Sequence, residues 1–192
     1  MTRLVDRTHG RWPWVAAAGA VPATAVYVAR GGQLAEGAAW ALWGSLPALF
    51  WHETEEWVVP GGFMPWFNRE LMGCSEDEAP LGRRTGLVVN VCAGWGLSIA
   101  AGLRGLRSPW LAAALLTSHV GNAGLHLATA ARTRRYNPGA ATSALLLAPL
   151  GLGGLAALAR RPEVRARELT AGVAVGVAGS VALFALMRRR VR

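Results

Sequence analysis

Apolar and polar positions are grouped in long blocks along the chain. Short stretches that hold most of the charged side chains separate six apolar blocks, at about 12–29, 37–57, 85–103, 109–131, 137–159 and 168–187. Each block approaches the roughly 20 residues that an α-helix needs to cross a bilayer. The pattern predicts an all-α fold, a single transmembrane domain over residues 1–192 built as a polytopic bundle of about six membrane-spanning helices.

The first block admits a second interpretation. Arg3, Arg7 and Arg11 precede it, and Ala23-Thr24-Ala25 fits the small-residue cleavage site of a signal peptide. The block is weakly apolar, because it is rich in alanine and Pro22 interrupts it. Since it contains no leucine, we favour a retained membrane anchor over a cleaved signal peptide.

Composition supports a membrane protein and argues against a nucleic-acid partner. The chain has 192 residues, of which 53% are hydrophobic and 16% charged, and its net charge of +9 comes from 20 arginines and no lysine. These arginines flank the apolar blocks, where lipid phosphate and membrane topology explain them better than nucleic acid does. The two cysteines, Cys74 and Cys92, indicate neither a disulfide framework nor a metal-binding CxxC pair.

The distribution of arginine predicts the orientation. If the N-terminus is cytoplasmic, the inside segments carry thirteen arginines and the outside segments seven. Cytoplasmic loops are enriched in arginine, so we expect a multi-pass protein of the plasma (inner) membrane with both termini in the cytoplasm. The segment 160–167 opposes this orientation, because it places four of the arginines outside.

Ionisable side chains interrupt the second apolar block near its end. His52 lies three residues before Glu55 and four before Glu56, so a helix places all three side chains on one face. A charge near the centre of a membrane helix costs about 2.5–3.5 kcal/mol, which makes such residues candidates for function. An imidazole and two carboxylates on one face can bind a metal, with a carboxylate acting as a base beside it.

Polar residues of other blocks are predicted to lie at the same depth. At about 1.5 Å per residue, His52 and His126 both lie roughly 22–24 Å along their helices from the outer face. The other polar side chains expected in this cytoplasmic third of the membrane are Glu55, Glu56, Asn90, Asn122 and Asn137. Because these residues come from four helices, we expect them to converge on one site. His119 lies roughly 10 Å from His126 along the same helix, so we expect a supporting or structural role for it.

Neighbouring residues receive more ordinary interpretations. Glu53 points about 100° away from His52, so we expect a surface or interfacial charge that can pair with Arg69. The aromatic segment 57–67 is predicted to be a loop packed at the inner interface or, alternatively, a lid for a lipid-like substrate. The acidic run 76–78 is expected to be solvated.

The set His52, Glu55 and Glu56 resembles the signature of the bacterial HXXEE-motif family of membrane proteins. The pair Asn122 and His126 and the turn 136–139 are similar to later polar positions of that family, so the resemblance covers about residues 40–160. It implies a small polytopic membrane protein whose biochemical function is not established, and the chemistry has to be argued from the residues.

The favoured hypothesis is a membrane-embedded metalloenzyme. His52, His126 and one of Glu55 and Glu56 would bind a divalent metal, and the other carboxylate would be a general base toward a metal-bound water. Asn122 is a further candidate ligand, and the supporting residues would be Asn90, His119 and Asn137. Zinc would suit a hydrolase, which we favour, whereas paired carboxylates could hold iron or manganese. The substrate would be an amphiphile that enters near the inner leaflet.

Two alternatives stay open at this stage. The same groups could form a proton- or metal-ion-binding transporter or a small-ligand binding protein, although their clustering at one depth favours a site over a path. They could also be an interfacial ion-pair network with Arg69 or Arg132.

Overall fold

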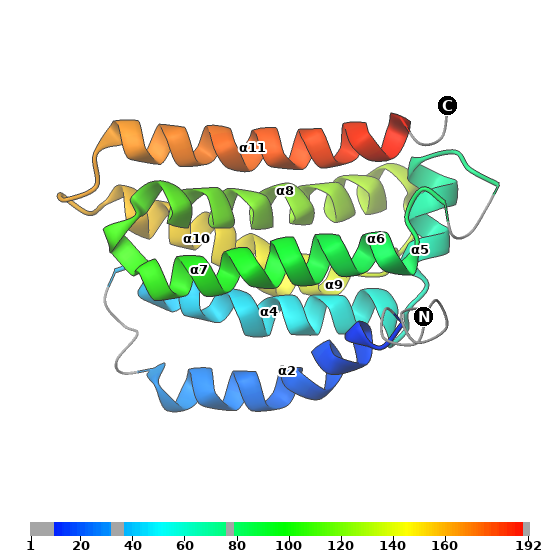
Figure 1. Cartoon of the computed structure of the whole chain (residues 1–192), viewed down its shortest axis with the longest axis horizontal. Helices are drawn as coiled ribbons and strands as arrows, with labels where there is room; N and C mark the ends of the chain where they lie inside the picture. Colours follow the sequence, from blue (N-terminus) through cyan, green and yellow to red (C-terminus); the bar gives the residue numbers. More distant parts are fainter. Residues whose placement is uncertain (1–9, 32–36, 76–78, 190–192) are drawn as a thin grey trace, which may run out of the picture.

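The computed structural model describes residues 10–31, 37–75 and 79–189, and this part of the chain is helical without a strand. The all-α prediction is therefore confirmed. The helices are α2 (Trp12–Ala29), α4 (Ala39–Trp57), α5 (Phe63–Trp66), α6 (Arg83–Leu87), α7 (Gly96–Arg104), α8 (Pro109–Thr133), α9 (Ala140–Thr142), α10 (Ala148–Ala159) and α11 (Ala166–Arg189) (Figure 1). Arg3, Arg7, the acidic run 76–78, Arg190 and Arg192 lie outside the described residues.

Irregular helical turns join some of these helices into longer rods. The π-helix η2 (Val88–Trp95) connects α6 to α7, and the π-helix η4 (Ser143–Leu147) connects α9 to α10. A third π-helix, η1 (Phe67–Leu71), continues α5, and the 3₁₀ turn η3 (Gly105–Arg107) precedes α8. The fifth apolar block begins as a helix only at residue 140, because Pro138 and the left-handed Gly139 (φ +97°) precede it.

Four of the rods are long and apolar enough to cross a membrane, namely Trp12–Ala29, Arg83–Arg104, Ala140–Ala159 and Ala166–Arg189. The two other long helices, α4 and α8, carry the acidic and imidazole side chains and are not among these four. The structure thus supports a membrane protein with four apolar helices around a more polar pair.

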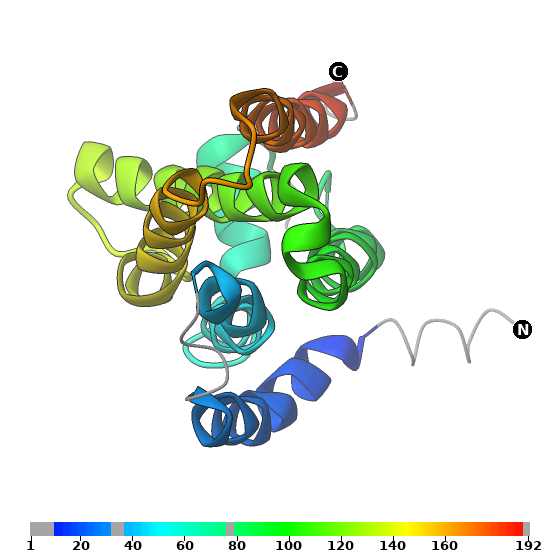
Figure 2. The same cartoon turned by 90° about the vertical axis from the view of Figure 1, so that its left-hand side faces the viewer.

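The polar pair is central and the apolar helices surround it. α11 packs along α8 on one side, α2 packs along α4 on the other, and α7 and α10 contact both central helices (Figure 1 and Figure 2). Glycine allows the closest approach: a Cβ atom on Gly176 of α11 would lie 2.7 Å from the Ala114 carbonyl oxygen of α8. Small residues at such contacts are typical of helices that pack within a bilayer.

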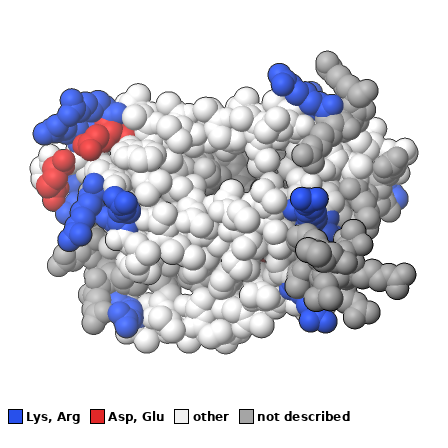
Figure 3. All heavy atoms as spheres, viewed as in Figure 1, with Lys and Arg blue, Asp and Glu red and all other residues white. Residues whose placement is uncertain are grey.

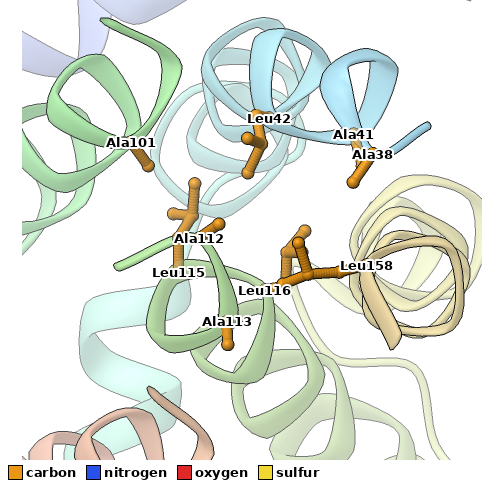
Figure 4. Packing of buried hydrophobic residues seen from close by; sticks show 9 residues of the cluster. All are labelled: Ala38, Ala41, Leu42, Ala101, Ala112, Ala113, Leu115, Leu116 and Leu158. Atoms are coloured by element: carbon orange, nitrogen blue, oxygen red, sulfur yellow. The ribbon is translucent and has the colours of Figure 1, made fainter. Parts of the chain in front are cut away.

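The main hydrophobic core joins the central helices at the end far from the acidic residues. Figure 4 shows side chains of α4, α7, α8 and α10 meeting there, together with Ala38, which precedes α4. Its buried members are Ala38, Ala41, Leu42, Ala101, Ala112, Ala113, Leu115, Leu116 and Leu158. Alanine predominates, so the helices approach closely and hold α4 and α8 in a fixed relative rotation.

The surface is apolar between two charged ends. Figure 3 shows the charged side chains of one face at both ends of the molecule, with an uncharged band between them. Large apolar side chains of the outer helices are exposed within the bundle's length, among them Val26 on α2 and Val181 on α11. An exposed apolar surface of this extent marks a membrane-facing or interaction surface.

Candidate metal centre

Two neighbouring helices bring three ionisable side chains to one buried point. α4 supplies His52 and, one turn later, Glu56, and α8 supplies His126. Their side chains are at most 4% exposed. The Nε2 atoms of His52 and His126 lie 3.3 Å and 3.2 Å from the same Glu56 oxygen, Oε1, and all three ligand atoms lie within 4.8 Å of one another. The three residues form a group that can hold a metal ion.

The separations match the edges of a metal coordination sphere. Zinc bonds of about 2.0–2.2 Å to nitrogen and oxygen at tetrahedral angles place two ligand atoms roughly 3.3–3.5 Å apart. Octahedral geometry at similar bond lengths gives an edge of roughly 3.0 Å. The two nitrogen–oxygen distances, 3.3 Å and 3.2 Å, are in the range that ligand atoms of one metal ion require.

The outer hydrogen bonds assign the protons of both imidazoles. Asn137 donates from Nδ2 to the His126 carbonyl oxygen at 3.0 Å, so its Oδ1 atom, 2.7 Å away, accepts from His126 Nδ1. Thr142 donates its hydroxyl proton to Glu55, so its Oγ1 atom accepts from His52 Nδ1 at 2.8 Å. Each histidine then directs its Nε2 atom toward the group, where it can donate a lone pair to a cation or, in the protonated ring, a proton to Glu56. Histidine ligands of metals are held by outer hydrogen bonds of this kind.

Both Nε2 atoms lack a hydrogen-bond partner among the described residues. Two nitrogen lone pairs face a buried carboxylate oxygen, an arrangement that is repulsive unless a cation or proton lies between them. Buried charges in proteins are paired or coordinate metals. The chemistry of the donor set therefore fits a divalent cation.

Aromatic rings and a glycine enclose the imidazoles. The Trp66 ring stacks on His126 with centroids 6.0 Å apart, Phe63 lies 5.3 Å from it, and the two histidine rings meet edge to face at 5.0 Å. A Cβ atom on Gly139 would lie 2.6 Å from Cε1 of His126 and 2.9 Å from Cε1 of His52. Phe63 and Trp66, which belong to the short helix α5 and not to a loop as predicted, thus form a packed wall of the group.

The other glutamate of the motif, Glu55, faces away from the group formed by His52, Glu56 and His126. It accepts hydrogen bonds from the Tyr136 hydroxyl at 2.7 Å and from the backbone N–H groups of Ala141 and Thr142 at 3.0 Å and 2.7 Å, besides the Thr142 hydroxyl. Partial burial and the adjacent carboxylate raise the pKa of Tyr136, so its hydroxyl stays protonated and donates. Glu55 therefore fastens the start of α9 to the end of α4, and Thr142 links it to His52.

The structure places the other predicted site residues outside this hydrogen-bonded set. Asn122 and Asn90 are half-buried, on α8 and in η2 respectively. His119 is buried on α8, with an Nε2 atom that has no hydrogen-bond partner in the described part of the chain. Of the predicted supporting residues, Asn137 is the one that holds a histidine of the group.

Sequence analysis missed Thr142 and Gly139 as site residues. The Pro-Gly pair at 138–139 was a visible turn signal, but nothing in the sequence indicated that the turn would lie against two histidines. Thr142 carried no signal, because its partners are about 90 residues away in the chain.

The expectation for Glu53 is wrong. Its side chain is fully buried, and both carboxylate oxygens accept from Trp95 Nε1, at 2.9 Å and 2.8 Å. The π-helix η2 ends at Trp95 and packs against α4 on this side. Among the carboxylates at 53, 55 and 56, Glu56 forms ion pairs with His52 and His126, and the alternative of a network with Arg69 or Arg132 stays a prediction.

Residues 43–153 match the family described as "Protein of unknown function with HXXEE motif", and the chain belongs to this family. The matched region includes the three residues of the group and the turn that supports them. No curated protein and no solved structure matches the chain.

Gly139→Ala is expected to destabilise the protein more than Gly62→Ala. Both glycines have left-handed backbones (φ +97° and +89°), but a Cβ at Gly62 meets nothing within 4 Å. The backbone strain, about 1–2 kcal/mol, is therefore the same in both alanine variants. Displacing the imidazoles should add roughly 1–3 kcal/mol in Gly139→Ala alone. The midpoints of thermal unfolding in detergent measure the difference, and equal midpoints would contradict the close packing of Gly139 on the histidines.

Proposed function

We propose that this member of the HXXEE family is a metal-dependent membrane enzyme, a hydrolase that acts on an amphiphilic substrate. His52, Glu56 and His126 would be the metal ligands. One observation carries the proposal: two imidazoles, each with its Nδ1 atom hydrogen-bonded outside the group, direct their Nε2 atoms to one buried carboxylate oxygen.

The ligand set favours catalysis over a purely structural metal. Structural zinc sites are usually closed by four protein ligands, whereas two histidines and one glutamate leave a position open for water or substrate. A metal there would polarise a substrate carbonyl or phosphoryl oxygen and activate water. Two nitrogen ligands and one oxygen ligand suit zinc, which is the metal we propose. Glu55, the second motif carboxylate, does not contribute to the group, which disfavours a bridged pair of metals.

Glu56 and Glu55 have different proposed roles. Glu56 would hold the metal, and because it is the one carboxylate in the group, it is also the proposed acceptor for a proton from the reacting water. Both oxygens of Glu55 are engaged by donors of the segment 136–142. Glu55 is therefore a positioning residue, which fixes Thr142 and through it the ring of His52, and we do not assign it the role of general base.

The position of the site supports an amphiphilic substrate. His126 lies two turns before the end of α8, where the chain continues into Arg132, Arg134 and Arg135. Tyr136, which contacts Glu55, is more than half exposed. The reactive group of a substrate would thus sit close to the level of lipid headgroups, with its apolar part in the bilayer.

We also propose that α4 and α8 cross the membrane, which gives six spans in all. Polar side chains are tolerated in spanning helices when they face the bundle interior, as His52, Glu53, Glu56 and His126 do. The arginine bias favours the cytoplasm for the end of the bundle that holds the site, with both termini on that side of the plasma membrane.

A proton- or metal-ion transporter is the second candidate. The observation that favours it is the unpaired Nε2 atom of buried His119, which lies farther along α8 toward the other end. A transport path would have to continue past His119. There α8 contributes Ala112, Ala113, Leu115 and Leu116 to the apolar core, and these side chains offer an ion no ligand, so the enzyme is the better supported function.

Metal analysis tests the ligand assignment. Purified wild-type protein should carry about one divalent ion per chain, and His52→Ala, His126→Ala and Glu56→Gln should each lose at least 90% of it, since even outer-shell changes weaken metal sites by roughly 10–100-fold. His119→Ala is the matched control, a buried histidine of α8 outside the group, and should keep its metal. Full metal content in the three ligand variants would remove the assignment.

Hydrolysis tests the reaction class. Metal-loaded protein in mixed micelles should cleave at least one amphiphile from a panel of esters, amides and phosphodiesters. A chelator should abolish the reaction, and Glu56→Gln should reduce kcat/KM by roughly 10²-fold or more. Metal-loaded protein that cleaves none of them but carries the ion across proteoliposomes would instead support the transporter.

Cysteine accessibility tests the topology. In a background with Cys74 and Cys92 replaced by serine, Glu163→Cys should react with an impermeant reagent in intact cells. Glu70→Cys, an exposed position at the other end of the bundle, should react only after permeabilisation, because three spans separate it from residue 163 when α8 crosses the membrane and two when it does not. Labelling of both positions from the same side would contradict the six-span arrangement.

A further inference from the structure

A basic cavity lies at the end of the bundle opposite the metal centre. It has a volume of about 610 Å³ and is formed where α7 turns into α8 and where α10 turns into α11. Figure 1 shows these two connections at the same end of the molecule, and Figure 3 shows charged side chains gathered there. The residues of the cavity that matter here are Leu103, Arg104, Arg107, Arg161, Glu163 and Val164.

The charge of the cavity is positive. Arg104 and Arg107 come from one connection and have no acidic partner within the described part of the chain. On the other side, Arg161 forms an ion pair with Glu163 at 2.7 Å. Glu163 is the one acidic residue among the described residues that line the cavity. Guanidinium groups bind phosphate with two parallel hydrogen bonds. An anionic group with several oxygens therefore matches the lining.

The basic region extends beyond the cavity. An adjoining hollow of about 370 Å³ shares Arg161 and Glu163 with it and adds Arg160 and the backbone of Gly37. Arg161 thus lies between two recesses, with its guanidinium group close to Gly37. The two recesses together give room for a headgroup larger than a phosphate ion.

The flank of the cavity is apolar. Leu103 lines the cavity and is 72% exposed, and Ile99, one turn earlier on α7, is 47% exposed. Both belong to the rod Arg83–Arg104, which is apolar enough to lie in a membrane. A ligand that extends from the arginines along this helix would place its apolar part against Leu103 and Ile99.

We infer that this cavity binds the headgroup of an anionic phospholipid, with Arg104 and Arg107 on the phosphate and the acyl chains along α7. The inference rests on the proposed membrane location and is independent of the metal. Basic pockets between membrane helices bind anionic headgroups. The site also gives a role to Arg160 and Arg161, two of the four arginines between residues 160 and 167, which the arginine bias alone assigns to the less favourable side.

Lipid titration tests this site. The full chain in zwitterionic detergent is titrated with phosphatidylglycerol, with phosphatidylcholine of the same acyl chains and with inorganic phosphate, and bound lipid is counted by native mass spectrometry. Wild-type protein should prefer phosphatidylglycerol, and Arg104→Gln/Arg107→Gln should weaken its binding on the order of tenfold or more. Glu163→Gln should strengthen binding, a gain that misfolding would not produce.

The matched control is Arg30→Gln/Arg167→Gln, which removes the same charge from the same end without touching either recess. It should change the affinity by no more than about twofold, because surface charges outside the contact are screened. Equal losses in the two double variants would overturn the site in favour of a diffuse charge effect. Inorganic phosphate that binds as tightly as the lipid would overturn the lipid assignment.

Discussion

The contact of Glu56 with two imidazoles is the interaction on which the rest of the site depends. A carboxylate buried between helices has to be neutralised, and here the neutralising groups come from both central helices. That requirement fixes how α4 and α8 are rotated about their axes. The surrounding residues hold the two imidazole rings that meet this carboxylate. Asn137 and Thr142 form hydrogen bonds with the rings, Glu55 holds Thr142, and Gly139 packs against both rings.

The level of the site residues along their helices could be predicted from the sequence, but the rotation of each helix about its own axis could not. The apolar blocks located the helices to within a few residues, and counting along α4 and α8 brought His52 and His126 to one level. The rise per residue gives height alone, so it could not tell which motif carboxylate would face His126. That choice depends on the turn at 136–142, which offers four donors to Glu55 and none to Glu56. The burial of Glu53 depends likewise on the π-helix that places Trp95 beside α4.

The two ends of the bundle differ in the environment of their charged side chains. At the group of His52, Glu56 and His126, the charge is enclosed, and the surrounding groups are imidazoles, an amide, a hydroxyl and aromatic rings. At the opposite end, guanidinium groups line open recesses. The alanine-rich core lies between the two ends, so neither has a polar connection to the other through the described interior. A change at one end would reach the other only through the rigid helices.

The π-helix η4 begins one residue after Thr142. Each residue of a regular α-helix advances by about 100°, and a π-turn accommodates an extra residue without ending the helix. The same rod can therefore direct Thr142 toward α4 and, farther on, pack Gly151 against Leu116 and Val120 of α8. The length of this segment therefore matters for the site, because a one-residue deletion would rotate one part of the rod against the other and separate the hydrogen bonds of Thr142 from the packing of Gly151.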